Sequence, residues 1–201
     1  MSHKPDEVVA KDSGGNFSPH SEGQFAMLCV DVVDLGVNVD QFPGQEPREV
    51  AKVALVFASG ERQTDESLTL VTTEMTLSAN EKANLRKFLE SWRGKSYTAE
   101  QAEAGLPVNK LYGQSALVSI EHVLTRKSRK FAKIVSIGPL PKAMPSPDGK
   151  LLVEYERPKF LVDRKAAYAA ALAKHRENGG EIQPPGYTGA DEDDDDSEVP
   201  F

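Results

Sequence analysis

The segment from Asp191 to Phe201 carries the most distinctive chemistry of the chain. Seven of its eleven residues are acidic, and it closes on Val199-Pro200-Phe201. Adjacent like charges with almost no apolar surface cannot pack, so we expect a disordered acidic tail over residues 181–201. Phe201 joins an aromatic ring to a terminal carboxylate, which suits a small apolar pocket rimmed by basic side chains. The tail therefore predicts a binding site for a partner protein. The alternative is an acidic segment that only keeps the protein soluble. The predicted partner-binding residues are Asp193, Asp194, Asp195, Asp196, Val199, Pro200 and Phe201.

A second candidate site is the basic run Arg126-Lys127-Ser128-Arg129-Lys130, which Lys133 extends. Arginine and lysine side chains neutralise phosphates and release counterions, and an aromatic ring beside them can stack on an unpaired base. Phe42, in a loop earlier in the chain, is the candidate ring. The run therefore predicts nucleic-acid binding. The alternative is a hairpin turn whose charges are simply solvated.

Candidate catalytic and metal-binding residues are sparse. The histidines His3, His20, His122 and His175 are scattered, and the sequence shows no Ser-His-Asp arrangement, Gly-rich phosphate loop or metal-ligand spacing. Cys29 lies in an apolar run and is expected to be a buried thiol. We therefore predict a protein that is not an enzyme and takes no cofactor or metal. A nuclease would require clustered carboxylates in the folded body.

The distribution of charge leaves room for a basic surface. The formal net charge is −7, but residues 1–190 hold 24 of the 31 acidic residues together with all 24 lysines and arginines. The body is thus neutral on average, and a local basic patch is compatible with an acidic chain. The polar amino-terminal residues, the lone cysteine and the lack of a long apolar run predict a cytosolic protein without membrane association.

Five strands and one main helix are expected to position these residues. Alternation and β-branched or aromatic content predict strands over residues 25–35, 49–58, 68–77, 115–124 and 131–137, with Gly36 ending the first. Within the second strand, two sets of alternating residues are expected on opposite faces, namely Val53, Leu55 and Phe57 against Lys52, Ala54 and Val56.

The main helix has its own local signals. Ser78 and Glu81 have the spacing of a capping box, which predicts the start of a helix. An apolar stripe at helical spacing follows, and Gly94 is expected to end the helix. The stripe consists of Leu85, Phe88, Leu89 and Trp92.

The order of the elements predicts the fold. Three strands, one helix and two more strands match the OB-fold, a mainly β, five-stranded Greek-key barrel with one helix between strands three and four. We expect a disordered arm over residues 1–22, the barrel over 23–142 and an extension over 143–180. In the extension, Leu151–Tyr155 is compatible with an edge strand, and a short helix is expected from Asp163 to about Arg176.

Two resemblances support this reading. The tail is similar to that of bacterial single-stranded-DNA-binding proteins, in which an acidic segment ending in Pro-Phe docks replication and repair partners. Residues 24–142 resemble phage-encoded single-stranded-DNA-binding proteins of the OB-fold type. The matching segments are Thr76-Leu77-Ser78, Glu81-Lys82-Ala83-Asn84-Leu85-Arg86, Leu89-Glu90-Ser91-Trp92-Arg93-Gly94, Gly113 and Ile134-Val135-Ser136-Ile137-Gly138-Pro139-Leu140-Pro141.

These resemblances imply sequence-independent binding of single-stranded DNA in phage replication or recombination, with weaker binding of duplex DNA and self-association left open. The tail would recruit replication or recombination proteins and compete for the DNA groove. The alternative is a non-catalytic adaptor that uses the barrel as a peptide-binding module. The predicted nucleic-acid contacts are Phe42, Lys52, Phe57, Arg62, Thr72, Lys95, Tyr97, Tyr112, Arg126, Lys127, Arg129, Lys130 and Lys133.

Overall fold

The computed structural model describes residues 18–124 and 129–180 of the chain. Its centre is a five-stranded antiparallel sheet with the order β3-β2-β1-β4-β5. The strands are β1 (Gly23–Asp40), β2 (Arg48–Arg62), β3 (Leu68–Thr76), β4 (Ser115–Leu124) and β5 (Lys130–Pro139). A mainly β structure with a few helices is therefore confirmed. The predicted tail, the arm residues 1–17 and the candidates Arg126 and Lys127 lie outside the described residues.

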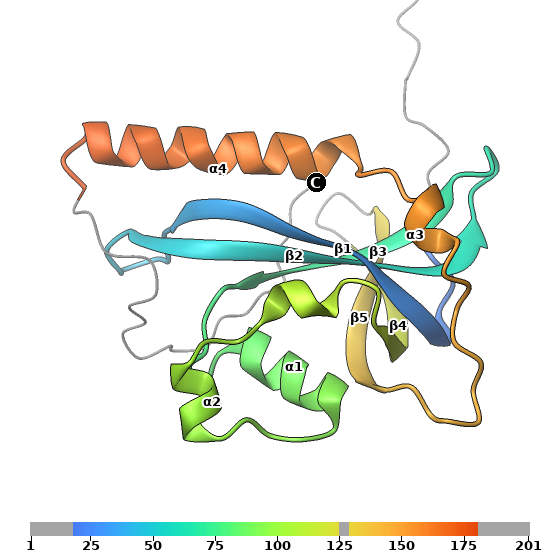
Figure 1. Ribbon diagram of the computed structural model, residues 1–201. Helices are drawn as coiled ribbons and strands as arrows, with labels where there is room; N and C mark the ends of the chain where they lie inside the picture. The colour runs from blue at the N-terminus through green and yellow to red at the C-terminus, as the bar shows by residue number, and fades with distance from the viewer. Residues whose placement is uncertain (1–17, 125–128, 181–201) are drawn as a thin grey trace, which may run out of the picture.

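Helices flank this sheet on both sides (Figure 1). Between β3 and β4 the chain forms α1 (Asn84–Arg93), α2 (Ala99–Glu103) and the 3-10 turn η1 (Val108–Leu111), and after β5 it forms α3 (Leu151–Glu154) and α4 (Lys159–Glu177). In Figure 1, α4 runs along β1 and β2 on one side, while α1 and α2 lie on the other. The edge strands β3 and β5 approach within 8 Å between Cα atoms, although no hydrogen-bonded ladder joins them in the described part of the chain.

Two apolar clusters correspond to the two faces of the sheet. Val53, Leu55 and Phe57 of β2 pack with the α1 residues Leu85, Leu89 and Trp92. Ala54 and Val56, which alternate with them, pack with Leu151 and Leu161 of the extension. The predicted separation of the β2 faces is therefore confirmed, and so is the apolar stripe of α1. Both faces of β2 are covered in its middle part, which explains why residues 52–58 are continuously buried.

Several predicted boundaries were wrong. Gly36 does not end the first strand but lies within it at a positive φ of 81°, beside a shift in the pairing of β1 with β2. Glycine tolerates this conformation, so the strand bends and continues. The helix α1 begins at Asn84 after Ala83, without a side-chain cap, and Ser78 Oγ instead accepts a hydrogen bond from the Asn80 amide. A capping box does form further on, between Thr98 and Gln101 at the start of α2.

The extension also differs from the expectation. Residues Leu151–Glu154 form the short helix α3 and not an edge strand. The following helix begins four residues earlier than expected, at Lys159 after Pro158, and α4 is 19 residues long. Proline at this position suits a helix start because the missing amide would have no partner inside the helix. None of the helices in residues 18–124 and 129–180 has the length and apolar character needed to cross a membrane.

Candidate nucleic-acid interface

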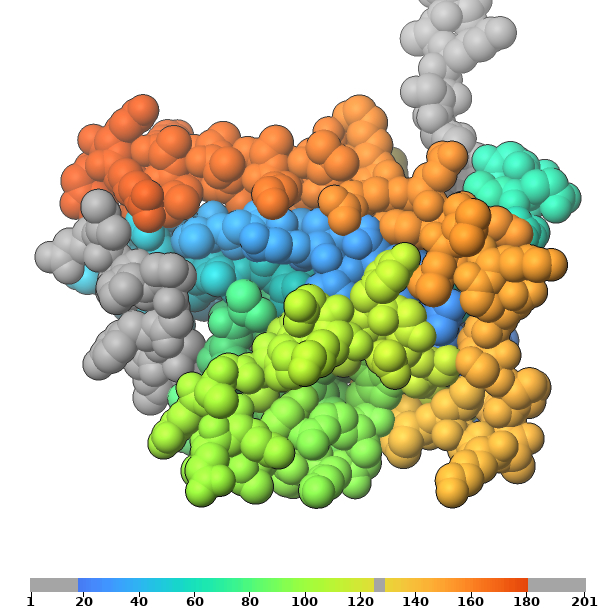
Figure 2. Space-filling model, in the orientation of Figure 1, coloured from blue at the N-terminus to red at the C-terminus, as the bar shows by residue number. Residues whose placement is uncertain are grey.

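The extension covers part of one face of the sheet, chiefly along β1, and reaches Ala54 and Val56 of β2. The pairing of Val56 with Thr72 places Thr72 on the face that carries the extension cluster. Figure 2 shows α4 as a continuous ridge along the strands β1 and β2. Lys52 was predicted to meet phosphate, but it is 7% exposed, and its Nζ lies 2.7 Å from Asp40 Oδ2. This prediction is corrected: the Lys52 charge is already neutralised inside the protein.

Carboxylates line the covered face. Asp31, Glu49 and Glu74 come from β1, β2 and β3, and each forms an ion pair with an arginine that follows β5. A hydrogen bond from Arg176 holds the pKa of Glu49 below its ordinary value. Burial would raise the pKa of Asp31, but hydrogen bonds from Arg157 and Tyr155 outweigh it and lower that pKa. Without α4 this face would be anionic and would repel a phosphate backbone.

Phe57 is part of the core. Its side chain is 0% exposed, and its ring centroid lies 5.4 Å from that of Trp92 and 6.4 Å from that of Phe88. A nucleic-acid base can stack only on a ring that solvent can reach. The prediction of Phe57 as a DNA contact is therefore corrected.

Other predicted contacts lie on separate loops. Phe42 is half-buried in the loop between β1 and β2. Arg62, at the end of β2, forms an ion pair with Glu154 of α3 and donates a hydrogen bond to the Glu66 carbonyl. The positive charge of Arg62 is thus largely neutralised within the protein. Tyr112, after η1, is 52% exposed.

A second small group gathers at the carboxyl end of α1. The guanidinium of Arg93 lies 4.0 Å from the centroid of the Tyr97 ring. Tyr97 is half-buried against the core cluster, and Lys95 is exposed beside it. The guanidinium of Arg93 therefore covers one face of the Tyr97 ring. A base or a phosphate could contact the planar guanidinium group of Arg93 in place of that ring face.

The start of β5 brings together the remaining predicted cations. Arg129 precedes this strand, Lys130 is its first residue and Lys133 follows three residues later. Arg129 and Lys130 are exposed, and Lys133 is half-buried. Lys133 lies opposite Glu121 of β4 in the register of the hairpin, so one carboxylate reduces the positive charge of this surface.

Phe131 lies among these cations and was missed by the sequence reasoning. Its neighbours Ala132 and Ile134 pack against the core, whereas Phe131 belongs to neither apolar cluster. It pairs with Val123 across the hairpin and remains half-buried. Because side chains alternate along a strand, Phe131 and Lys133 share the face turned away from the core. This alternation was readable in the sequence and would have identified the ring.

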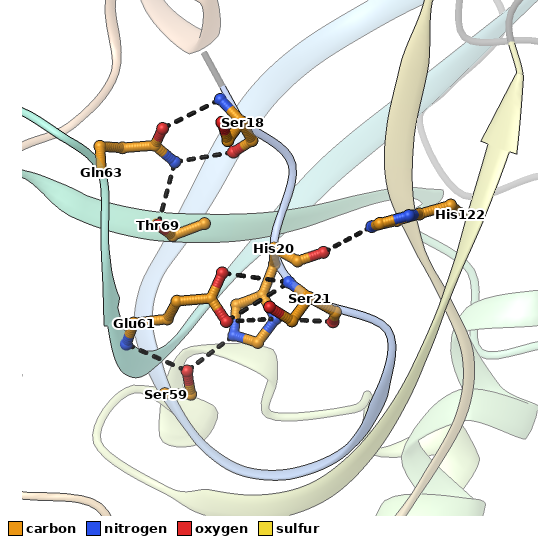
Figure 3. Close-up of polar contacts among 8 residues, drawn as sticks. All are labelled: Ser18, His20, Ser21, Ser59, Glu61, Gln63, Thr69 and His122. Carbon is orange, nitrogen blue, oxygen red and sulfur yellow. Dashed lines mark hydrogen bonds and ion pairs between the residues drawn. The ribbon is translucent and has the colours of Figure 1, made fainter. Parts of the chain in front are cut away.

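A polar cluster around the buried His20 joins residues 18–22 to the sheet (Figure 3). His20 is 0% exposed; its Nε2 lies 2.7 Å from Ser59 Oγ, and its Nδ1 lies 3.0 Å from the Ser21 carbonyl oxygen and 3.5 Å from Glu61 Oε2. Ser59 Oγ also accepts a hydrogen bond from the Glu61 amide. His122 Nε2 lies 2.8 Å from the His20 carbonyl oxygen.

The hydroxyl, imidazole and carboxylate of this cluster follow the order of a nucleophilic hydrolase triad. The surroundings favour a structural role. The imidazole is enclosed, and the Glu61 carboxylate accepts a hydrogen bond from the Ser21 amide. Gln63 also binds both the amide and the carbonyl of Ser18. We interpret the cluster as an anchor that fixes residues 18–22 on the ends of β2 and β4.

The described residues contain no cluster of side chains that could bind a metal ion. No group of three or more histidine, cysteine, aspartate or glutamate side chains in them is placed to hold a metal ion. Burial raises the pKa of the Cys29 thiol to about 12, so this sulfur stays protonated and is a poor nucleophile or ligand.

Comparison with known proteins adds no family to these observations. No protein-family model, no curated protein and no solved structure matches this chain.

Proposed function

We propose that this protein binds single-stranded DNA without sequence preference and without catalysis, in phage replication or recombination. The observation that carries the proposal is Phe131, a ring on the outer face of β5 with Arg129 and Lys133 two residues away on either side. Cations track a phosphate backbone, and a ring stacks on bases of any identity. A duplex keeps its bases stacked inside, so this combination favours a single strand.

We also propose that the sheet closes into a Greek-key barrel of the OB type. Three features support this step: β1 pairs with both β2 and β4, the edges β3 and β5 approach each other, and α1 contacts both edges. In such a barrel the helix between strands three and four fills one end. The binding surface would then lie on the β4–β5 hairpin, because α4 and the carboxylates beneath it exclude DNA from the outer face of β2 and β3.

The first test is an anisotropy titration of labelled oligothymidine at two salt concentrations, with unlabelled duplex as competitor. We expect tight binding that weakens with salt and resists the duplex. For the double variant Lys130→Gln/Lys133→Gln, the magnitude of the salt slope should fall by about 1.4, since each lost phosphate contact removes about 0.7 from single-strand slopes. The matched control is Lys87→Gln/Lys174→Gln, which removes two exposed lysines from α1 and α4.

Each outcome of this titration decides between functions. An equal loss of slope in both double variants would show that net charge, and not the hairpin, governs binding. No binding at either salt concentration would overturn the proposal and favour the adaptor, which would recognise a peptide with little dependence on salt.

The acidic tail should compete with DNA for the cations of the body. Seven carboxylates on a tether act at a high effective concentration. Deletion of residues 191–201 is expected to tighten oligothymidine binding several-fold at low salt and to abolish partner recruitment. Two variants separate these effects: exchange of the seven acids for Asn and Gln should affect DNA binding, and removal of Phe201 alone should affect only recruitment. Unchanged DNA affinity after the deletion would contradict the competition.

A further inference from the structure

Beyond Leu161, the helix α4 makes little apolar contact with the sheet. In α4 only Leu161 is buried, and Tyr168 and Leu172 are half-buried. Most of the alanines that follow Arg164 are exposed. A 19-residue helix with one buried side chain gains little from apolar contact. Other contacts must therefore hold it in place.

Three ion pairs provide these contacts along the length of the extension. Arg157 donates to Asp31 at 2.8 and 3.0 Å, and Arg176 donates to Glu49 at 3.0 and 2.8 Å. Between them, Arg164 lies 3.6 Å from Glu74. The hydroxyl of Tyr155 donates to Asp31 at 2.7 Å, and that of Tyr168 donates to Glu74. In addition, Lys165 Nζ donates to the carbonyl oxygen of Asp34 at 2.8 Å.

These three pairs have their acid on the sheet and their base on the extension, whereas the pair between Arg62 of β2 and Glu154 of α3 has the opposite arrangement. The side chain of Glu49 is 2% exposed, whereas that of Arg176 is 42% exposed. Asp31 and Arg157 show the same asymmetry, at 12% and 49%. Loss of the arginine would leave a covered carboxylate without its partner, which is costly unless the helix moves away and water enters.

We propose that the extension is an electrostatic latch: α3 and α4 undock from β1, β2 and β3 as a unit, while the sheet stays folded, when their ion pairs are screened or broken. The strip uncovered in this way combines the apolar residues Val33, Ala54 and Val56 with carboxylates. It therefore complements a basic helix such as α4 and not a nucleic acid.

The direction of the pH dependence follows from the groups that face each acid. The Asp31 carboxylate faces Arg157 and Tyr155, while the Cys29 thiol bonds instead to the Asp31 backbone carbonyl. Glu49 faces Arg176 and His175, and Glu74 faces Arg164 and Tyr168. The docked state lowers the pKa of Asp31 and Glu49, so docking is strongest above their ordinary pKa values and is lost as the pH falls through the lowered ones. Burial and the bond to Glu74 raise the pKa of Tyr168 to about 12, so this hydroxyl remains a donor at neutral pH.

Hydrogen exchange followed by mass spectrometry tests the latch on the full-length protein. We expect NaCl at about 1 M, where the Debye length is about 3 Å, to speed amide exchange in residues 166–177 about ten-fold relative to low salt. Amides of β2 from Val53 to Ala58 should not change. The triple variant Arg157→Gln/Arg164→Gln/Arg176→Gln should show fast exchange in α4 already at low salt.

A matched variant separates the latch from the general loss of positive charge. Lys142→Gln/Lys159→Gln/Lys174→Gln removes the same number of charges from exposed positions of the same part of the chain. It should keep α4 protected. The latch is overturned if α4 and β2 exchange together under all conditions, or if the two triple variants behave alike.

Discussion

Replacement of Phe131 by alanine is expected to weaken binding of oligothymidine by roughly 5- to 150-fold. This range corresponds to the loss of about 1–3 kcal/mol when one base loses its aromatic stacking partner. Phe131 lies outside both apolar clusters, so its removal should cost the fold no more than about 1 kcal/mol, as for other cross-strand pairs. Anisotropy titration measures the first effect, and urea unfolding measures the second.

Two further substitutions at this position identify the type of contact. Phe131→Tyr keeps the ring and should bind nearly as the unchanged protein does. Phe131→Leu keeps much of the apolar area without the ring and should resemble Phe131→Ala. The salt slope should remain the same in all three variants, because no charge is altered. Full affinity in Phe131→Leu would mean that the ring is not a stacking platform.

The elements that could be predicted from the sequence are those governed by local periodicity. The alternation along β2 and the spacing of Leu85, Leu89 and Trp92 each reflect burial against a continuous core, and the structure confirms both. The start of α1 could not be found in this way. Ser78 and Glu81 had the spacing of a capping box, but Ser78 bonds to the local turn at Asn80 and the helix begins later.

The candidate site was harder to predict because it depends on contacts between distant segments. Nothing near Lys52 in the sequence indicates that Asp40 neutralises it across the β1–β2 hairpin. The ion pair of Glu49 with Arg176 spans 127 residues of the chain. These pairings remove Lys52 from the predicted interface, and they leave the basic run at the start of β5, which the sequence had already indicated, as the candidate surface.

The largest expected effect on stability belongs to Trp92. Trp92 is 6% exposed, and its ring packs with those of Phe57 and Phe88 at centroid distances of 5.4 and 6.3 Å. Its Nε1 donates a hydrogen bond to the carbonyl of Ser115, where β4 begins. Trp92 thus joins α1 to the core and to the strand of the proposed interface. Trp92→Ala should lower the free energy of unfolding by about 3–5 kcal/mol, since it opens a cavity and leaves that carbonyl unpaired.

Trp92→Phe separates the two contributions, because it fills most of the space but lacks the indole donor. It should cost about 1–3 kcal/mol, the penalty for one unsatisfied buried group. Trp92 is the only tryptophan of the chain, so urea unfolding of these variants must be followed by circular dichroism. The exposed Leu124→Ala is the control and should change stability by less than about 0.5 kcal/mol. At urea concentrations below its unfolding midpoint, Trp92→Phe should still bind oligothymidine fully, because the Trp92 ring packs in the core beneath the β4–β5 hairpin and does not contact DNA. A loss of affinity in this folded variant would place the DNA contact at α1 and not on the outer face of β5.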